Sequence, residues 1–269
     1  MNVHRAPTTV APRTLAQLGG TALVMLVALA MVVPCAASFA KANVGRGGQH
    51  AQRAQQAQYD FPDQAPLADV PTGAVIANMD ERGCRAALRA QGASFTAYSG
   101  EHHDEIRNDG LLLNGPLNGV RFEHAGSNPL YSALDCRLAL ALLAWTPTLR
   151  EFGVTRIQHM STFRPNSRVA GTDRASGHSR ALAIDLRYVE FEDGTRLDVL
   201  SDWSSRERGA PPCTHPPDEQ GPSAVLRRIV CRAITDELFQ VVVSPHHNDA
   251  HANHVHLEVR PEVTWQSIQ

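Results

Sequence analysis

The sequence predicts an α+β fold in which a central antiparallel sheet is flanked by helices. Two segments, 130–143 and 223–238, carry apolar residues at three- and four-residue steps, the spacing of helices that bury one side. Four short segments have the alternation or the β-rich composition of strands. They are 154–160, 181–191, 239–243 and 254–259. Because helices and strands do not alternate regularly along the chain, an antiparallel core is favoured over a parallel sheet.

Features of an export signal occupy residues 1–40. Arg5 and Arg13 precede an apolar run over about 21–40, and the stretch contains no acidic residue. Ser38-Phe39-Ala40 offers small residues at the positions that a signal peptidase reads. The run is also just long enough to cross a bilayer, so a cleaved signal and an uncleaved inner-membrane anchor both stay open. In either case the folded part is expected in the periplasm or cell envelope.

The segment after the signal, 41–73, is rich in Gln, Ala, Gly and Pro and lacks apolar periodicity, which is typical of a flexible linker. The remaining residues, 74–269, have the length of one catalytic-sized domain. The formal net charge is −2, and no run rich in lysine or arginine occurs anywhere in the chain. Nucleic acid is therefore not an expected partner.

Four cysteines remain once the signal, which contains Cys35, is set aside. They are Cys84, Cys136, Cys213 and Cys231. An even number in an oxidising compartment predicts two disulfides, for which three pairings exist. We favour Cys84 with Cys136 and Cys213 with Cys231 because these partners are closer in sequence. A zinc site built from four thiolates would need C-x-x-C spacing, which is absent.

Three short elements are predicted before the first long helix. Residues 84–92 indicate a short helix that is closed by Gly92, and 95–98 have the composition of a strand. Between 110 and 124, Gly, Asn and Pro stand at intervals among leucines, which indicates either a hairpin or a loop excursion.

The first long helix lies between Pro129 and Gly153. Pro147 is expected to end or kink it, with 149–152 adding another turn before the glycine. The strand at 154–160 then leads into a polar loop.

The next strand, 181–191, is followed by Glu-Asp-Gly-Thr at 192–195, a hairpin turn signal. A Pro-rich loop over about 204–222 precedes the amphipathic helix at 223–238. The two remaining strands complete the sheet.

Two histidine-bearing stretches, 176–185 and 251–256, together predict one zinc site. His178 precedes a predicted strand that contains Asp185, so both side chains can reach one end of the sheet. His256 lies two residues after His254 in another strand, and side chains two apart in a strand share a face. Histidine nitrogen and carboxylate oxygen are common zinc ligands.

The other histidines lack such spacing, although 13 histidines are many for this length. His159 lies in a predicted strand and is expected in the core or next to the site. Ordinary hydrogen bonding or exposure to solvent is expected for His102, His103, His215, His246 and His247.

The first histidine stretch resembles a known group. The pattern S-x-H-x-x-G-x-A-x-D, followed near the carboxyl end by H-x-H, marks the LAS zinc peptidases, which include D-Ala-D-Ala carboxypeptidases and peptidoglycan endopeptidases. Ser176, His178, Ala183 and Asp185 match this pattern. Ala181 stands where the group has glycine, a change that crowds the turn without removing a ligand.

A wider likeness, over about half of the chain, is to the extensin-like carboxyl-terminal domain family of bacteria. It covers Ile157 to Arg164, the first histidine motif, the Asp193-Gly194 turn, Trp203, Cys231, 239–243 and His256.

The resemblance implies a LAS-peptidase-like fold and a role for each histidine of the two stretches. It implies His178, Asp185 and His256 as ligands of Zn²⁺, and His254 as the catalytic base or transition-state donor. His251 matches a histidine at the metal site of the penicillin-insensitive murein endopeptidases and is assigned an accessory part.

Arg164 is the candidate substrate-binding residue. Thr162-Phe163-Arg164 resembles the S-G-Y-R element of the carboxypeptidases, whose arginine holds a substrate carboxylate. An ordinary salt bridge is the alternative for this arginine. Thr162 stands where that element has glycine, and the E-x-x-H motif of that branch is absent, so the endopeptidase arrangement is the better match.

The resemblance thus implies an exported zinc peptidase that cleaves an amide bond in peptidoglycan stem peptides or cross-links. The alternative is a non-catalytic cell-wall binding or structural module stabilised by metal, and a third interpretation is a protein whose histidines are incidental. His254 favours the enzyme, because a structural site needs only the ligands.

Overall fold

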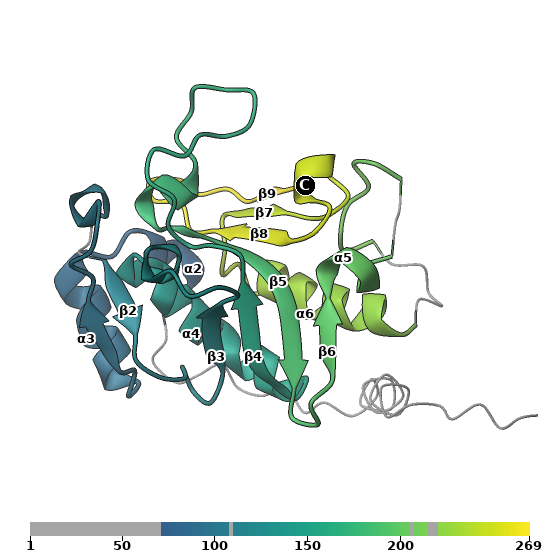
Figure 1. Cartoon of the computed structure of the whole chain (residues 1–269), viewed down its shortest axis with the longest axis horizontal. Coiled ribbons are helices and arrows are strands. Elements are labelled where there is room, and N and C mark those ends of the chain that lie inside the picture. Colours follow the sequence, from purple (N-terminus) through teal and green to yellow (C-terminus); the bar gives the residue numbers. More distant parts are fainter. Residues whose placement is uncertain (1–70, 108–109, 205–206, 215–219) are drawn as a thin grey trace, which may run out of the picture. The chain divides into compact units, whose positions relative to one another are not determined.

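The computed structural model describes residues 71–107, 110–204, 207–214 and 220–269, all within one compact unit (Figure 1). The expected export segment, nearly all of the linker and His215 lie outside the described residues. In the part of the chain that is described, no helix is long and apolar enough to cross a membrane.

The predicted α+β class is confirmed by a seven-stranded sheet with helices packed on it (Figure 1). The strand order is β3-β4-β5-β8-β7-β9, and β6 pairs with β5. The bounds are β3 Arg121–His124, β4 Val154–His159, β5 Ala183–Phe191, β6 Arg196–Asp198, β7 Val241–Val243, β8 Val255–Glu258 and β9 Ser267–Ile268. The central strands β4, β5, β8 and β7 are antiparallel, as expected, whereas β3 and β9 pair in parallel at the two edges.

The pairing of β5 with β8 brings the two histidine stretches together. In this antiparallel register Asp185 stands opposite His256, and Leu186 stands opposite Val255. Residues directly opposite each other in such a pair have neighbouring side chains on the same face. The sheet therefore juxtaposes two candidate metal ligands that are far apart in sequence.

The long helices α4 (Cys136–Glu151) and α6 (Pro222–Thr235) cover one face of the sheet (Figure 1). Trp145 joins them, since its indole N–H donates to the carbonyl of Ile229, and its ring packs edge-on against Phe239. The shorter helices are α2 (Gly73–Ala77), α3 (Glu81–Ala90) and α5 (Val199–Asp202). Burial of the apolar sides of α4 and α6 gives the sheet a rigid support.

Helix α4 starts later than predicted and runs through its proline. It begins at Cys136 because the side chain of Asp135 caps it by accepting from the N–H of Arg137. Pro147 cannot donate to the carbonyl of Leu143, but the hydroxyl of Thr146 donates to that carbonyl instead at 2.6 Å. The expectation that the helix could end at this proline was therefore wrong, whereas the further turn expected before Gly153 is present, since α4 continues to Glu151 with Phe152 as its C-cap.

The segment predicted as a hairpin or loop excursion divides between two sheets. Strand β2 (Leu111–Leu113) pairs with β1 (Phe95–Ala97), and β3 joins the large sheet beside β4. The two strands of this segment therefore do not pair with each other. The predicted turn after β5 is present, with Gly194 at φ 81° between β5 and β6.

Both favoured disulfides are present. Cys84 on α3 is bonded to Cys136 at the start of α4, and Cys213 is bonded to Cys231 on α6. Two such bonds indicate an oxidising compartment outside the cytoplasm.

Removing Cys84–Cys136 by the double change to alanine should lower the free energy of unfolding by about 4 kcal/mol, because this bond closes 52 residues of the unfolded chain. Removing Cys213–Cys231, which closes 18 residues, should cost about 3 kcal/mol. Urea denaturation of the oxidised proteins measures both values. Unchanged midpoints in both variants would contradict the stabilising role.

Candidate metal centre

Three buried side chains from three segments converge on one point. His178 comes from the short turn η4 (Gly177–Arg180), Asp185 from β5 and His256 from β8. One ligand atom from each lies within 4.8 Å of the other two, so the group could hold a metal ion. These are the three residues that the sequence motifs implied as ligands.

The ligand atoms are close enough to share one cation. His178 Nε2 lies 2.9 Å from Asp185 Oδ1, and His256 Nδ1 lies 3.1 Å from the same oxygen. The two ring nitrogens are 3.1 Å apart. Two imidazole nitrogens and one carboxylate oxygen therefore point at a common position.

The second nitrogen of each ligand imidazole is held by a hydrogen bond that sets the tautomer. His178 Nδ1–H donates to the carbonyl of Thr162 at 3.0 Å, which leaves the lone pair on Nε2. His256 Nε2–H donates to Glu258 at 3.2 Å, so Nδ1 is the nitrogen that faces Asp185 and would bind a metal ion after losing its proton. Such outer partners orient metal-binding histidines and increase their basicity.

Glu258 was not identified in the sequence, although it lies two residues after His256 and therefore on the same face of β8. Its carboxylate is buried and also accepts from Arg260 Nε at 2.8 Å. Gly177 makes room for it, because a Cβ at that position would stand only 2.5 Å from the carboxyl carbon of Glu258. A larger residue there would displace the support of His256.

His254 lies at the site, and His251 lies at its border. His254 Nε2 is 3.4 Å from Asp185 Oδ1, and its Nδ1–H donates to the side chain of Asn253 at 2.8 Å. The ring of His251 is 5.1 Å from that of His254 between centroids, and its Nδ1 binds Asn248 at 2.7 Å. His254 thus presents a ring nitrogen to the metal group, and the ring of His251 lies 6.2 Å from that of His256 between centroids.

Arg164 and Ser161 contact the other oxygen of the aspartate. Arg164 Nη1 lies 3.2 Å from Asp185 Oδ2, and the Ser161 hydroxyl donates to the same oxygen at 3.3 Å. The salt bridge expected as the alternative for Arg164 is therefore present, although 45% of its side chain stays exposed. Ser161 was missed because a lone loop serine gives no signal in the sequence.

The charges of the cluster are strongly coupled. Burial opposes the charged form of Asp185, but His178 and His256 hold its pKa well below the usual range. Burial also opposes protonation of His256, yet its bonds to Asp185 and Glu258 raise the pKa to about 9. Burial lowers the pKa of His178 and of His254. The raised pKa of His256 favours a positive charge on this imidazole, beside that of the Arg164 guanidinium on Asp185.

Ala181 explains the one departure from the peptidase pattern. Its φ of 55° and ψ of 28° are left-handed, a conformation that glycine adopts freely and alanine only at a cost of about 1–2 kcal/mol. It closes η4, and β5 begins at Ala183, so the prediction that residue 181 belongs to the strand was wrong.

Among the described residues, the histidines outside the two stretches 176–185 and 251–256 do not belong to the metal group. His159 is buried in β4, and burial lowers its pKa to about 3. His246 is also buried, and its Nε2 accepts from the Trp203 indole N–H at 2.9 Å. Exposed or partly exposed positions are occupied by His102, His103 and His247.

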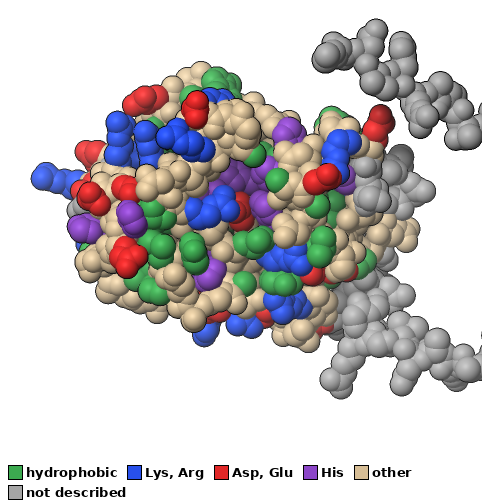
Figure 2. Space-filling model, turned by 45° about the horizontal axis from the view of Figure 1, so that its top comes forward, with side chains coloured by type: hydrophobic (Ala, Val, Ile, Leu, Met, Phe, Trp, Pro, Cys, Tyr) green, Lys and Arg blue, Asp and Glu red, His purple; other side chains and the backbone are tan. Residues whose placement is uncertain are grey.

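Of the residues at the site, His254 and His256 keep a small exposed fraction, 8% and 7%, whereas His178 and Asp185 are almost fully buried. Figure 2 shows histidine side chains gathered in a hollow of this face, with a basic and an acidic side chain beside them. Around the rim lie exposed side chains of several kinds.

A comparison with known families supplies one match. The model of the family described as Extensin-like protein C-terminus matches residues 82–267, which is more than half of the chain and includes every site residue named above. No curated protein and no solved structure matches the chain.

Glu258→Gln should weaken metal binding by about 10- to 100-fold, because an amide supports the His256 imidazole less strongly than a carboxylate does. Competition with a chromogenic chelator measures the affinity. Glu190→Gln is the matched control, since Glu190 is an ion-paired glutamate of the same sheet that is not in the metal group. An equal loss of metal affinity in both variants, or no loss of affinity in either, would contradict the supporting role of Glu258.

Metal affinity should rise with pH up to about 9, because the ion must displace the proton that His256 holds with that pKa. Below this value the expected slope is up to about tenfold per pH unit for one displaced proton. The same chelator titration, repeated from pH 6 to 10, measures it. In Glu258→Gln the pH above which the metal affinity stops rising should be lower than in the wild-type protein. A metal affinity that does not depend on pH would contradict the prediction.

Proposed function

The chain belongs to the family of extensin-like protein C-termini, and from this premise we propose that it is an exported zinc-dependent peptidase. Its substrate would be an amide bond in peptidoglycan stem peptides or cross-links. The observation that carries the proposal is the convergence of His178, Asp185 and His256 beside a further histidine, His254, that is 3.4 Å from the same carboxylate. The substrate class rests on the likeness of the motifs to those of the LAS peptidases.

The donor set fits zinc. With bonds of about 2.0–2.1 Å, tetrahedral ligand atoms lie roughly 3.3 Å apart. The three separations measured between ligand atoms, 2.9, 3.1 and 3.1 Å, are within a few tenths of an ångström of that value. Three protein ligands also leave the fourth position that catalytic zinc sites keep open. When bound, the ion would polarise the scissile carbonyl and acidify water.

His254 has the properties of a proton carrier for this reaction. Burial lowers its pKa, so the ring is neutral at neutral pH. Its bond from Nδ1–H to Asn253 leaves a lone pair on Nε2, which faces the cluster. Nε2 can therefore take a proton from water and return it to the leaving amine, as general acid–base catalysis requires.

Arg164 is placed to hold the substrate. Its backbone N–H donates to the carbonyl of His178 at 2.9 Å, and its guanidinium is anchored on Asp185. The exposed part of the guanidinium keeps N–H groups for a carbonyl or carboxylate of the peptide. The salt bridge thus orients Arg164 and is compatible with substrate binding.

A metal-stabilised wall-binding module is the alternative. Such a module would need only the three metal ligands, and His254 would have no function in it. The orientation of His254, with Asn253 fixing one nitrogen and the other turned to the cluster, supports the enzyme.

His254→Gln should keep zinc and lower the cleavage rate by about 10²- to 10⁴-fold, because the proton carrier is removed while the ligands remain. His178→Ala should lose both zinc and activity. The test is incubation of the zinc-loaded proteins with purified sacculi, followed by mass spectrometry of the released fragments.

His103→Gln is the control, since His103 is exposed and outside the cluster. It should release the same fragments as the wild-type protein. No fragments from zinc-loaded wild type at high concentration would overturn the proposal. Full activity in His254→Gln would overturn the role of that histidine.

A further inference from the structure

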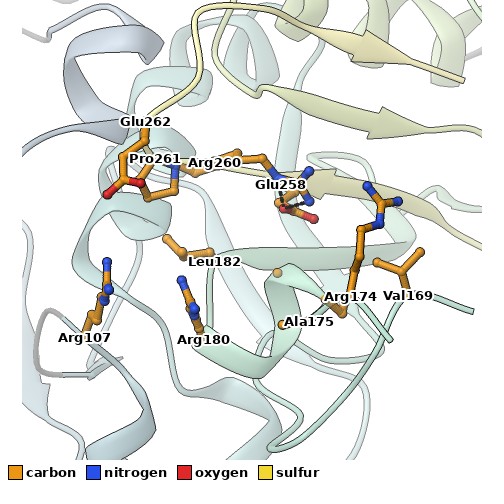
Figure 3. A pocket seen from close by; sticks show the side chains of 13 residues that line it. Arg107, Val169, Arg174, Ala175, Arg180, Leu182, Glu258, Arg260, Pro261 and Glu262 are labelled. Carbon is orange, nitrogen blue, oxygen red and sulfur yellow. Dashed lines mark hydrogen bonds and ion pairs between the residues drawn. The ribbon is translucent and has the colours of Figure 1, made fainter. Parts of the chain in front are cut away.

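A second concave site lies beside the metal centre, separated from it by the side chain of Glu258. It is a pocket of about 240 Å³, which we name the arginine pocket (Figure 3). The charged residues that line it are Arg107, Arg174, Arg180, Arg260, Glu258 and Glu262. Four arginines and two glutamates leave two positive charges in excess, in a chain whose formal net charge is −2.

Most of this positive charge has no internal partner. Arg260 is bonded to Glu258, with Nε at 2.8 Å from Oε1. Among the described residues, the guanidinium groups of Arg107, Arg174 and Arg180 have no ion-pair or hydrogen-bond partner. Like charges gathered at one concave surface repel one another and favour an anion between them. The pocket is therefore prepared for a negatively charged ligand.

The backbone of two segments places these arginines around the pocket. Arg174 lies in a loop whose two ends are hydrogen-bonded to each other. The carbonyl of Arg174 accepts from the N–H of Val169, and residues 168 and 175 form an antiparallel β-bridge. Arg180 ends the turn η4, which also carries the ligand His178. Figure 3 shows Arg107 and Arg180 at the left of the view and Arg174 at the right, with Arg260 and Glu258 above and between them.

The pocket shares a wall with the metal centre. One oxygen of Glu258 binds Arg260 in the pocket, and the other accepts from His256 at the centre. Gly177, which contacts Glu258, lines the pocket and directly precedes His178. Glu258 and His256 are two residues apart on β8, a distance of about 7 Å along a strand. A ligand group in the pocket would therefore lie within one or two peptide residues of an amide bound at the proposed metal centre.

We propose that the arginine pocket binds a free carboxylate of the peptide substrate and so selects acidic peptides for cleavage. Guanidinium groups bind carboxylates through paired, charge-assisted hydrogen bonds. The volume suits one acidic residue or a chain end better than a whole peptide. Leu182 and Pro261 add an apolar lining for its carbon chain. This proposal rests on the proposed function, because it assigns the specificity of the same site.

The test is calorimetric binding of a synthetic stem tetrapeptide to the full zinc-loaded chain in a His254→Gln background, which prevents turnover. The peptide is used with free carboxylates, with its side-chain carboxylate amidated and with its terminal carboxylate amidated. The pocket variant is Arg174→Gln with Arg180→Gln. Arg260 is left unchanged because it supports Glu258. The control variant, Arg121→Gln with Arg232→Gln, removes the same charge at two exposed arginines that do not line the pocket.

The pocket variant should bind the free peptide about tenfold more weakly, whereas the control variant should bind it as the parent does. Amidation of the recognised carboxylate should weaken binding to the parent by a similar factor and have no effect on the pocket variant. If the peptide with the amidated side chain binds more weakly, the pocket holds the side-chain carboxylate. If the peptide with the amidated terminus binds more weakly, the pocket holds the terminal carboxylate. Equal affinities of parent and pocket variant, or equal binding of all three peptides, would overturn the proposal.

Cleavage of sacculi separates this proposal from the proposed function. Absence of cleavage together with the expected difference in binding would reject the peptidase and retain the carboxylate site. Cleavage of free and amidated peptides at equal rates, by parent and pocket variants that retain His254, would reject the pocket and retain the peptidase.

Discussion

The charge on Asp185 is the constraint on which the candidate site depends. This carboxylate is 1% exposed, and an isolated buried charge is costly unless it is paired. The chain surrounds it with imidazoles at one oxygen and with Arg164 and Ser161 at the other. The raised pKa of His256, about 9, adds a second positive charge to that of Arg164. A cation held by the same three ligands would replace this second charge.

The geometry around the carboxylate is maintained by rigid neighbours. Register within the sheet sets Asp185 against His256, and the backbone carbonyl of Thr162 fixes the tautomer of His178. Glu258 fixes the other ligand imidazole and also faces the arginine pocket. One glutamate therefore connects the metal centre with the surface that we assign to substrate recognition. Its place depends on the missing Cβ of Gly177.

Much of this arrangement could be predicted from the sequence, because it depends on periodicity. The α+β class follows from the spacing of apolar residues, and alternation places His256 and Glu258 on one face of β8 (Val255–Glu258), whereas His254 directly precedes that strand. Contacts between segments that are far apart in the sequence could not be predicted, because periodicity within one segment does not report them. The helix continues through Pro147 because a threonine hydroxyl replaces the missing donor. The role of Glu258 depends on the packing of β8 against η4, and the parallel edge strands depend on pairing at long range.

The most direct test of the metal centre is zinc K-edge X-ray absorption of the zinc-loaded, oxidised protein. The account predicts a four-coordinate ion with two imidazole nitrogens, further oxygen or nitrogen ligands at about 2.0–2.1 Å and no sulfur. It also predicts that this spectrum is lost in Asp185→Asn. A sulfur shell, a six-oxygen shell, or a spectrum unchanged by Asp185→Asn would contradict the assignment of His178, Asp185 and His256 as the ligands.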